Sequence, residues 1–165
     1  MTSDFADLEA WLRMGETIYL GSHTFEAEEI KAFARKYDPQ PFHLDEKLAE
    51  KSVFGRLCAS GWHTCAMWMR HNLQHREDAG DAPWTGEAPA PVFGPSPGFE
   101  NLKWLKPVYA GDTVTFWRRA ESHRAMSSRP GWRVMIIVCG ADDAAGNTVL
   151  QFDSAVLLKV ESALA

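Results

Sequence analysis

The chain has little cysteine, no long apolar run and no excess of basic residues. Its three cysteines, Cys58, Cys65 and Cys139, lack the spacing of metal ligands, and an odd number fits poorly with a disulfide framework. No stretch approaches the roughly 20 consecutive apolar residues of a membrane-spanning helix. The formal net charge of −5 argues against nucleic-acid binding, which usually requires a basic patch. We therefore expect no bound metal, no nucleic-acid partner and no membrane insertion.

The N-terminal residues 1–14 lack the apolar segment of a signal peptide and contain Asp4, Asp7 and Glu9. We expect them to form an arm or a short helix, and we expect the protein to be cytoplasmic. The chain has 165 residues, 45% of them hydrophobic, which is enough for one globular domain with a full core. We therefore treat residues 1–165 as a single domain.

The first third of the sequence predicts a strand followed by helices. Residues 17–25 are typical of a strand, and residues 26–37 are typical of an amphipathic helix. The apolar positions of that helix recur at spacings of three and four: Ile30, Phe33, Ala34 and Tyr37. A shorter helix is predicted over residues 46–52, with Asp45 as its N-cap.

Residues 61–77 predict a long helix with Ser60 as its N-cap. Its main apolar stripe consists of Trp62, Cys65, Ala66, Met69 and Leu73. Met67 and Trp68 form a second apolar row, so we expect this helix to be covered on more than one side.

The rest of the chain predicts a long loop and then a sheet. Residues 79–98 are rich in Pro and Gly and have little periodicity, as in functional or mobile loops. Four β-rich segments follow, separated by turns: residues 99–109, 113–126, 132–141 and 148–160. The order of elements predicts an α+β protein with an antiparallel sheet and one helix packed on its face.

A carboxylate and an imidazole lie five residues apart in the segment Tyr-Asp-Pro-Gln-Pro-Phe-His-Leu-Asp, residues 37–45. On a continuous helix they would point in different directions, because only residues three or four apart share a face. Each proline pushes the residue before it out of the helical conformation, so the chain can turn and let Asp38 and His43 converge. A plainer interpretation has Asp38 as a turn former and His43 as a partly buried polar residue.

This segment resembles the hydratase signature of the MaoC-like family, in which an Asp and a His five residues apart flank a turn containing proline. Residues 54–63, Phe-Gly-Arg-Leu-Cys-Ala-Ser-Gly-Trp-His, resemble the entry to the family's central helix. Residues 98–108, Gly-Phe-Glu-Asn-Leu-Lys-Trp-Leu-Lys-Pro-Val, and the following Gly111-Asp112-Thr113 resemble its strand and turn after the variable loop.

The resemblance implies a hot-dog fold, a curved antiparallel β-sheet wrapped around a central α-helix at residues 61–77. It implies an acyl-thioester hydratase or dehydratase that adds water to a 2-enoyl thioester, or removes it from a 3-hydroxyacyl thioester. The substrate would be carried on coenzyme A or acyl carrier protein, without a further cofactor. A homodimer or higher homo-oligomer is also implied, and an unpaired sheet edge favours such pairing.

The implied catalytic residues are Asp38, His43 and Gly61. A carboxylate and an imidazole can share a water molecule and exchange roles as acid and base. In the family the glycine is taken to donate its N–H to the thioester carbonyl, where a helix N-terminus suits developing negative charge. Gly61 also has an alternative interpretation, in which it only allows close packing of helix and sheet.

The expected substrate-binding residues are Gln40, Phe42, Ser60 and Trp62. The chain departs from the better-studied hydratases at two of these positions, because they usually carry Asn in place of Gln40 and His in place of Ser60. We expect the acyl group to lie near Trp62 and the loop at residues 83–97. Four basic residues are candidates for contacts to the phosphates of the carrier: Arg56, Lys103, Lys106 and Arg118.

Two other functions remain open at this point. One is an acyl-thioesterase of the same fold, but residues 61–76 contain no Asp or Glu, and a common type of such enzymes has a carboxylate in its central helix. The other is a catalytically silent acyl-binding module, against which the intact pair of Asp38 and His43 counts.

Weaker candidates have structural explanations. His71 and His75 have a spacing that can hold a metal, but no third ligand is evident, so we expect surface histidines. Cys58 and Cys65 are expected to be buried small residues rather than nucleophiles.

Overall fold

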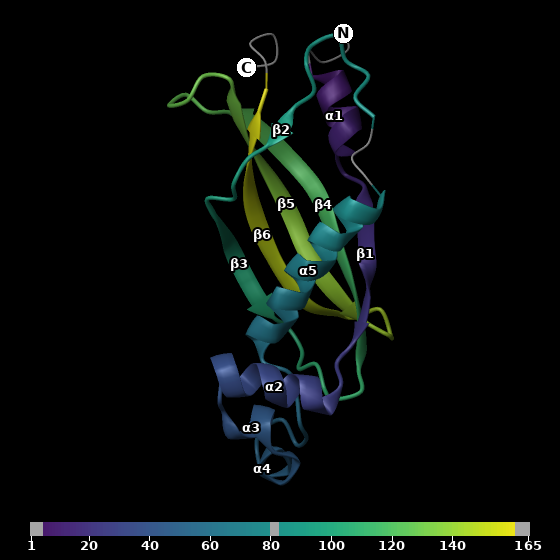
Figure 1. Ribbon diagram of the computed structural model, residues 1–165, viewed down its shortest axis with the longest axis vertical. Helices are drawn as coiled ribbons and strands as arrows, with labels where there is room; N and C mark the ends of the chain where they lie inside the picture. Colours follow the sequence, from purple (N-terminus) through teal and green to yellow (C-terminus); the bar gives the residue numbers. More distant parts are fainter. Residues whose placement is uncertain (1–4, 80–82, 161–165) are drawn as a thin grey trace.

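The computed structural model describes residues 5–79 and 83–160, which form a curved antiparallel sheet with a long helix against one face (Figure 1). The helices are α1 (Ala6–Leu12), α2 (Ala27–Tyr37), α3 (Pro41–Leu44), α4 (Glu46–Glu50) and α5 (Gly61–Ala79). The strands are β1 (Thr17–Thr24), β2 (Val92–Phe93), β3 (Gly98–Trp104), β4 (Thr113–Ala125), β5 (Trp132–Asp143) and β6 (Thr148–Lys159). The predicted α+β class is confirmed.

The strands of the described residues form one sheet in the order β1-β4-β5-β6, and β2 and β3 both pair with β6 at its outer edge. All the pairings are antiparallel. The register shifts between Tyr19 and Gly21 in β1 and between Ala120 and Ser122 in β4. Such bulges increase the local twist, which helps the long strands to curl around α5.

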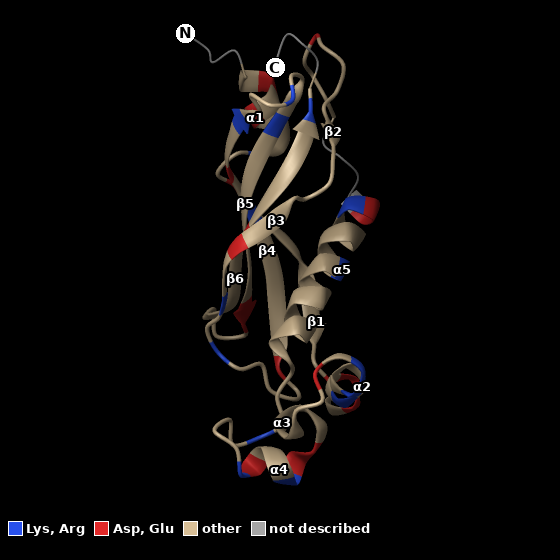
Figure 2. Cartoon of the chain, turned by 90° about the vertical axis from the view of Figure 1, so that its left-hand side faces the viewer, with Lys and Arg blue, Asp and Glu red and all other residues tan. Residues whose placement is uncertain are grey.

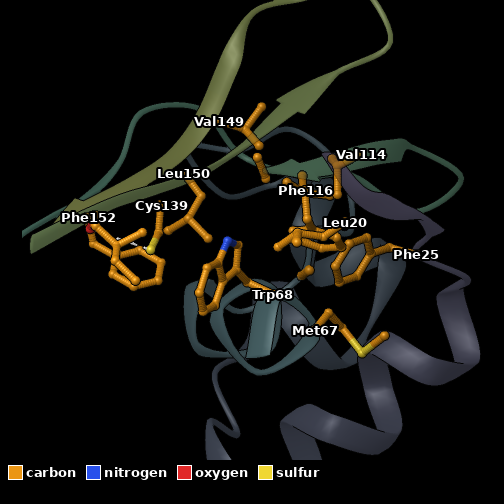
Figure 3. Packing of buried hydrophobic residues seen from close by; sticks show 14 of the residues in the cluster. Leu20, Phe25, Met67, Trp68, Val114, Phe116, Cys139, Val149, Leu150 and Phe152 are labelled. Carbon is orange, nitrogen blue, oxygen red and sulfur yellow. Dashed lines mark hydrogen bonds between the residues drawn. The ribbon is translucent and has the colours of Figure 1, made fainter. Parts of the chain in front are cut away.

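The hydrophobic core lies between α5 and the sheet (Figure 3). Trp68 is only 4% exposed, and its ring meets Phe152 of β6 edge to face, with 5.0 Å between the centroids. Its indole N–H donates a hydrogen bond to the carbonyl oxygen of Trp117 in β4, at 3.0 Å. Because a buried N–H needs a partner, this bond fixes the position of α5 over the central strands.

The face of α5 that packs on the sheet differs from the predicted main stripe. The structure buries the row of Met67 and Trp68, whereas Trp62, Met69 and Leu73 of the predicted stripe are each about half exposed. The prediction was wrong because both rows are apolar, and only the position of the sheet decides which one is buried.

Several element boundaries also differ from the predictions. Of the two predicted forms for residues 1–14, the described part is the helix α1, with Leu8 and Leu12 buried; residues 1–4 lie outside the described residues. The helical turn α3 and the two-residue strand β2 were not predicted, because neither is long enough to show a periodicity. Within the described residues, no helix is both long and apolar enough to cross a membrane.

His71 is half-buried in α5, which corrects its prediction as a surface residue. Its ring stacks on Phe116 of β4, with 5.0 Å between centroids. Gly21 in β1 has a φ of +119°, and a Cβ there would lie 3.0 Å from Nδ1 of His71. Among the described residues, no group of three or more His, Cys, Asp or Glu side chains could hold a metal ion.

Helices α2, α3 and α4 lie together at one end of the sheet, beside the beginning of α5 (Figure 1). Acidic and basic segments lie next to each other on α2 and α4 (Figure 2). The contact between α2 and α5 involves His63, which is 3% exposed, stacks on Phe33 at 4.5 Å and meets Phe25 edge to face at 5.0 Å. Its Nε2 lies 3.5 Å from Oε1 of Glu29 in α2.

Burial lowers the pKa of the His63 imidazole, and the nearby carboxylate of Glu29 raises it by less, so the net shift is downward from 6.5. The unfolded chain, with an ordinary imidazole, therefore binds a proton more readily than the folded chain. Stability that is present above about pH 6.5 is then lost as the pH falls through the lower pKa of the folded state.

We expect the free energy of unfolding of the wild type to fall as the pH is lowered from about 6.5 to about 5. In His63→Leu it should fall less steeply, and the two slopes should differ by up to about 1.4 kcal/mol per pH unit. Urea unfolding at a series of pH values measures this slope. His75→Leu, on the same helix, is the control and should keep the wild-type slope. An unchanged slope in His63→Leu would contradict this prediction, because it would mean that His63 has the same pKa in the folded and the unfolded chain.

Candidate active site

The site forms where α2 ends and α5 begins. The helix α2 ends at Tyr37, and Asp38 leaves the helical conformation with φ −153° and ψ 69°. Gln40 is extended, with φ −81° and ψ 143°, and Pro41 then starts the short helix α3. The two prolines thus act as predicted, because each excludes the helical conformation from the residue before it.

The turn brings Asp38 and His43 together. Nε2 of His43 lies 3.5 Å from Oδ2 of Asp38. Nδ1 of the buried ring lies 2.7 Å from the carbonyl oxygen of Cys58. A carbonyl oxygen can only accept, so Nδ1 carries a hydrogen, and Nε2 faces the carboxylate either as a free acceptor or as the second N–H of the cation.

Asp38 accepts two hydrogen bonds, one on each carboxylate oxygen. The Gln40 side-chain amide donates to Oδ1 at 2.8 Å, and the Ser60 hydroxyl donates to Oδ2 at 2.7 Å. Partial burial raises the pKa of Asp38, but the bonds from Gln40 and Ser60 and the charge of His43 lower it by more. The net shift is downward from 3.8, so Asp38 is ionised near neutral pH.

The beginning of α5 lies beside this pair. The Ser60 hydroxyl also accepts the backbone N–H of Trp62 at 3.2 Å, which confirms Ser60 as the N-cap of the helix. The backbone N–H of Gly61 makes no hydrogen bond to any of the described residues. It is one of the N–H groups that the start of a helix leaves unpaired, and it is available to an acceptor such as a carbonyl oxygen.

Gly61 is also needed for packing. A Cβ at this position would lie 2.3 Å from Cε2 of Trp104, whose indole lies over the glycine from β3. The structure therefore supports the alternative interpretation of Gly61, close packing of helix and sheet, together with a free N–H. Both properties follow from its place at the first position of α5.

A cavity of about 400 Å³ lies in front of these groups. Its lining combines the polar residues Asp38, Gln40, His43 and Gly61 with apolar side chains, including Phe42, Trp62, Trp104 and Val108. Such a mixture, mostly apolar with a few convergent polar groups, is typical of a small-molecule site.

The predicted binding residues Gln40, Phe42 and Trp62 all line the cavity. The Phe42 ring meets that of His43 edge to face at 4.6 Å, and the Trp62 ring meets that of Trp104 in the same way at 5.1 Å. The hydroxyl of Ser60, in contrast, is engaged by Asp38.

The described loop residues 83–97 do not line this cavity, which corrects their predicted place near the acyl group. Trp84 of the loop instead contacts Trp11 of α1, and Trp11 stacks on Phe93. The wall of the cavity is formed by the end of β3 and the residues after it, from Trp104 to Val108. Trp104 belongs to a segment with family resemblance, but the sequence did not indicate that its ring would lie over Gly61.

The four basic residues considered as phosphate contacts have different positions. Lys106 lines the cavity, and Arg56 lies over the Tyr109 ring at 4.0 Å and 3.5 Å from Asp112. Arg118 donates to Asn72 on the other side of α5, and neither it nor Lys103 lines the cavity. Lys106 is therefore the best placed of the four.

The cysteines have the environment expected of structural residues. Cys58 is buried and Cys65 is partly buried. Burial raises the pKa of each of these thiols to about 11, which disfavours the reactive thiolate. Cys58 contributes to the site through its backbone carbonyl, a role that no side-chain pattern indicates.

Comparison with known proteins agrees with this architecture. A model of the MaoC-like domain matches residues 12–129. A MaoC-like dehydratase from Rhodospirillum rubrum is 31% identical, over 90% of this chain and 93% of that chain, with a TM-score of 0.72. No match was found among curated proteins.

Two more distant structures share the fold. An (R)-hydratase from A. caviae involved in PHA biosynthesis is 20% identical, over 90% of this chain and 96% of that chain, with a TM-score of 0.60. The HadBC complex, a 3R-hydroxyacyl-ACP dehydratase from Mycobacterium tuberculosis, is 16% identical, over 87% of this chain and 96% of that chain, with a TM-score of 0.63.

The curled antiparallel sheet around one long helix is the hot-dog fold, as predicted. The chain belongs to the MaoC-like dehydratase family, so the resemblance of its three sequence segments is confirmed.

Proposed function

We propose that the protein is an acyl-thioester hydratase or dehydratase, in which Asp38 and His43 form the acid–base pair. The observation that carries this proposal is the approach of Oδ2 of Asp38 and Nε2 of His43 to 3.5 Å beside a cavity of about 400 Å³. Gly61, whose backbone N–H makes no hydrogen bond to the described residues, lines the same cavity. Family membership supports the reaction class, and the geometry supports the roles of the residues.

In the hydration direction, a water molecule bound between Asp38 and His43 attacks C3 of a 2-enoyl thioester. The pair takes one proton from the water as its oxygen bonds to C3. The electrons of the double bond move toward C2 and the thioester oxygen, and the pair then returns a proton to C2. Water has thereby been added across the double bond, and the two side chains are back in their starting protonation states.

The negative charge that develops on the thioester oxygen needs a donor. The N–H of Gly61 supplies one without reorganisation, because it is held by the first turn of α5 and points out of the helix N-terminus. Removing one such donor typically costs about 100-fold to 1000-fold in rate, so this group is a large part of the proposed catalysis.

The substrate class is an acyl thioester on coenzyme A or acyl carrier protein, and no further cofactor is required. The apolar rings of Phe42 and Trp62 would contact the acyl or pantetheine chain, and Lys106 would lie at the phosphate side. A thioesterase is disfavoured because the α5 body, residues 61–76, contains no carboxylate and the pKa of Cys65 is raised.

We expect wild-type protein to hydrate members of a panel of 2-enoyl-CoA thioesters, and Asp38→Asn and His43→Ala each to lose at least about 100-fold in kcat/KM. The loss of absorbance of the conjugated thioester measures the rate. Asp45→Asn and His75→Ala are the matched controls, because Asn also caps a helix and His75 lies far along α5.

Wild-type rates in both site variants would defeat the acid–base assignment. Release of free thiol from acyl-CoA would identify a thioesterase instead. Binding of enoyl-CoA without any hydration would identify a silent binding module.

We also propose that two copies of the chain associate as a homodimer along β3. Strand β3 pairs with β6 on one side only, and its other edge has no partner strand among the described residues. Next to β3, Phe99 of that strand and Met69 of α5 are 56% and 50% exposed.

Phe99 and Met69 both line a small apolar groove of about 120 Å³ between α5 and β3. An open edge beside an apolar patch is costly to leave in water, and a second copy related by a two-fold axis covers both at once. The structurally similar HadBC dehydratase was itself solved as a complex.

Sedimentation velocity should give a species of twice the 18.5 kDa chain mass, and Met69→Glu should shift it toward the single chain, because a charge cannot be buried there without a partner. Leu48→Glu is the matched control, since Leu48 of α4 and Met69 are both 50% exposed. A monomeric wild type, or a dimer that tolerates Met69→Glu, would contradict the proposed interface.

A further inference from the structure

Ser60 is placed to act on Asp38 rather than on a substrate. It is 1% exposed, and its single hydroxyl proton is directed to Oδ2 of Asp38 at 2.7 Å. This is the same oxygen that faces Nε2 of His43 at 3.5 Å. Because a hydroxyl has only one proton, Ser60 cannot also donate to a bound thioester without giving up the carboxylate.

The hydroxyl is itself held by the helix. Its oxygen accepts the backbone N–H of Trp62 at 3.2 Å, so Ser60 connects the first turn of α5 to the carboxylate. An accepted hydrogen bond polarises the hydroxyl and strengthens the bond that it donates. Asp38 is thereby tied to the same helix end that presents the free N–H of Gly61.

We propose that Ser60 is a positioning residue, which holds Oδ2 of Asp38 toward His43 and keeps the carboxylate ionised through the hydrogen bond that it relays from the start of α5. This inference rests on the proposed function, because it explains how the acid–base pair is oriented. It assigns Ser60 to Asp38, in place of the substrate contact that the sequence suggested.

The two side chains that donate to Asp38, Ser60 and Gln40, differ in burial, and water can replace only one of them. Gln40 also donates to the carboxylate, at 2.8 Å to Oδ1, but its side chain is exposed. Water can replace an exposed hydrogen bond, whereas loss of the buried one leaves the carboxylate without compensation. The other titratable groups around Asp38 in the cavity are His43, Cys58 and Lys106.

The acid–base state of Asp38 reports this contact. Burial raises the pKa of the carboxyl, and the bonds from Gln40 and Ser60 and the charge of His43 lower it by more. Removing the Ser60 hydroxyl therefore raises the pKa, because a hydrogen bond to the ionised form is lost. The acid limb of the pH–rate profile should move to higher pH by the same amount.

The role of Ser60 as the N-cap of α5 can be separated by mutation from its role in positioning Asp38. Ala is a poor N-cap and costs about 1 kcal/mol of stability, whereas Gly costs only a few tenths. Ser60→Gly thus keeps most of the helix stability and removes the hydroxyl. If Ser60 were only a cap, Ser60→Gly would behave nearly like wild type and Ser60→Ala would not.

The test compares wild type, Ser60→Gly, Ser60→Ala and Gln40→Leu in the enoyl-CoA hydration assay. Both Ser60 variants should lose about 10-fold or more in kcat, with KM changed less than about 3-fold, since the carboxylate is displaced and not the substrate. The acid limb of the pH profile of kcat/KM should shift to higher pH by about one unit or more in both Ser60 variants. The shift should be smaller in Gln40→Leu.

Ser52→Ala is the matched control. The Ser52 hydroxyl also accepts an N–H two residues on, from Phe54, but it donates to the carbonyl of Ala49 and not to a site residue. Its pH profile should coincide with that of wild type.

A second measurement does not depend on turnover. The ¹³C shift of the Asp38 carboxyl, assigned by its absence in Asp38→Asn, should titrate at a higher pH in Ser60→Gly than in wild type. Equal titration in the two proteins would overturn the role of Ser60 while leaving the acid–base pair intact. Absence of hydration by wild type would instead defeat the proposed function, and the carboxyl titration would still decide whether Ser60 controls Asp38.

Discussion

The hydrogen bond from Ser60 to Asp38 connects the end of α2 to the beginning of α5. The geometry of the candidate site depends on this hydrogen bond. Asp38 is the first residue after α2, and Ser60 is the cap of α5, 22 residues later. The bond places a carboxylate beside an N-terminal helix turn, where unpaired N–H groups favour negative charge. Without it, Oδ2 of Asp38 would lose the buried donor that holds it beside Nε2 of His43.

Three further contacts hold α5 in the position that this hydrogen bond requires. The sheet fixes α5 through Trp68, whose N–H is bonded to a β4 carbonyl and whose ring packs on β6. His63 packs α2 onto the first turn of α5. Trp104 of β3 lies on Gly61 so closely that no side chain fits there. A helix held in this way can present its first N–H groups at a fixed place, which is what electrostatic stabilisation of a transition state requires.

The two positions where the chain departs from better-studied hydratases have a common explanation in the structure. Gln40 and Ser60 each donate to one oxygen of Asp38. The departures therefore leave the pair of Asp38 and His43 in contact and change what surrounds the carboxylate. A buried hydroxyl and an exposed amide together favour the ionised form of Asp38.

The sequence by itself determined the fold class and most of the helices and strands, and it indicated that Asp38 and His43 would come together. Prolines at 39 and 41 exclude a continuous helix for steric reasons that act locally, and Asp45 and Ser60 cap helices through bonds to residues two or three positions away. Such effects span only a few residues, so they can be predicted from the sequence.

The tertiary structure alone decided which apolar row of α5 is buried and that Trp104 covers Gly61. It also decided that the wall of the cavity comes from residues 104–108 and not from the loop at 83–97. It also decided that the Ser60 proton is given to Asp38, because contacts between residues far apart in the chain depend on how the elements pack, and no local pattern encodes that packing.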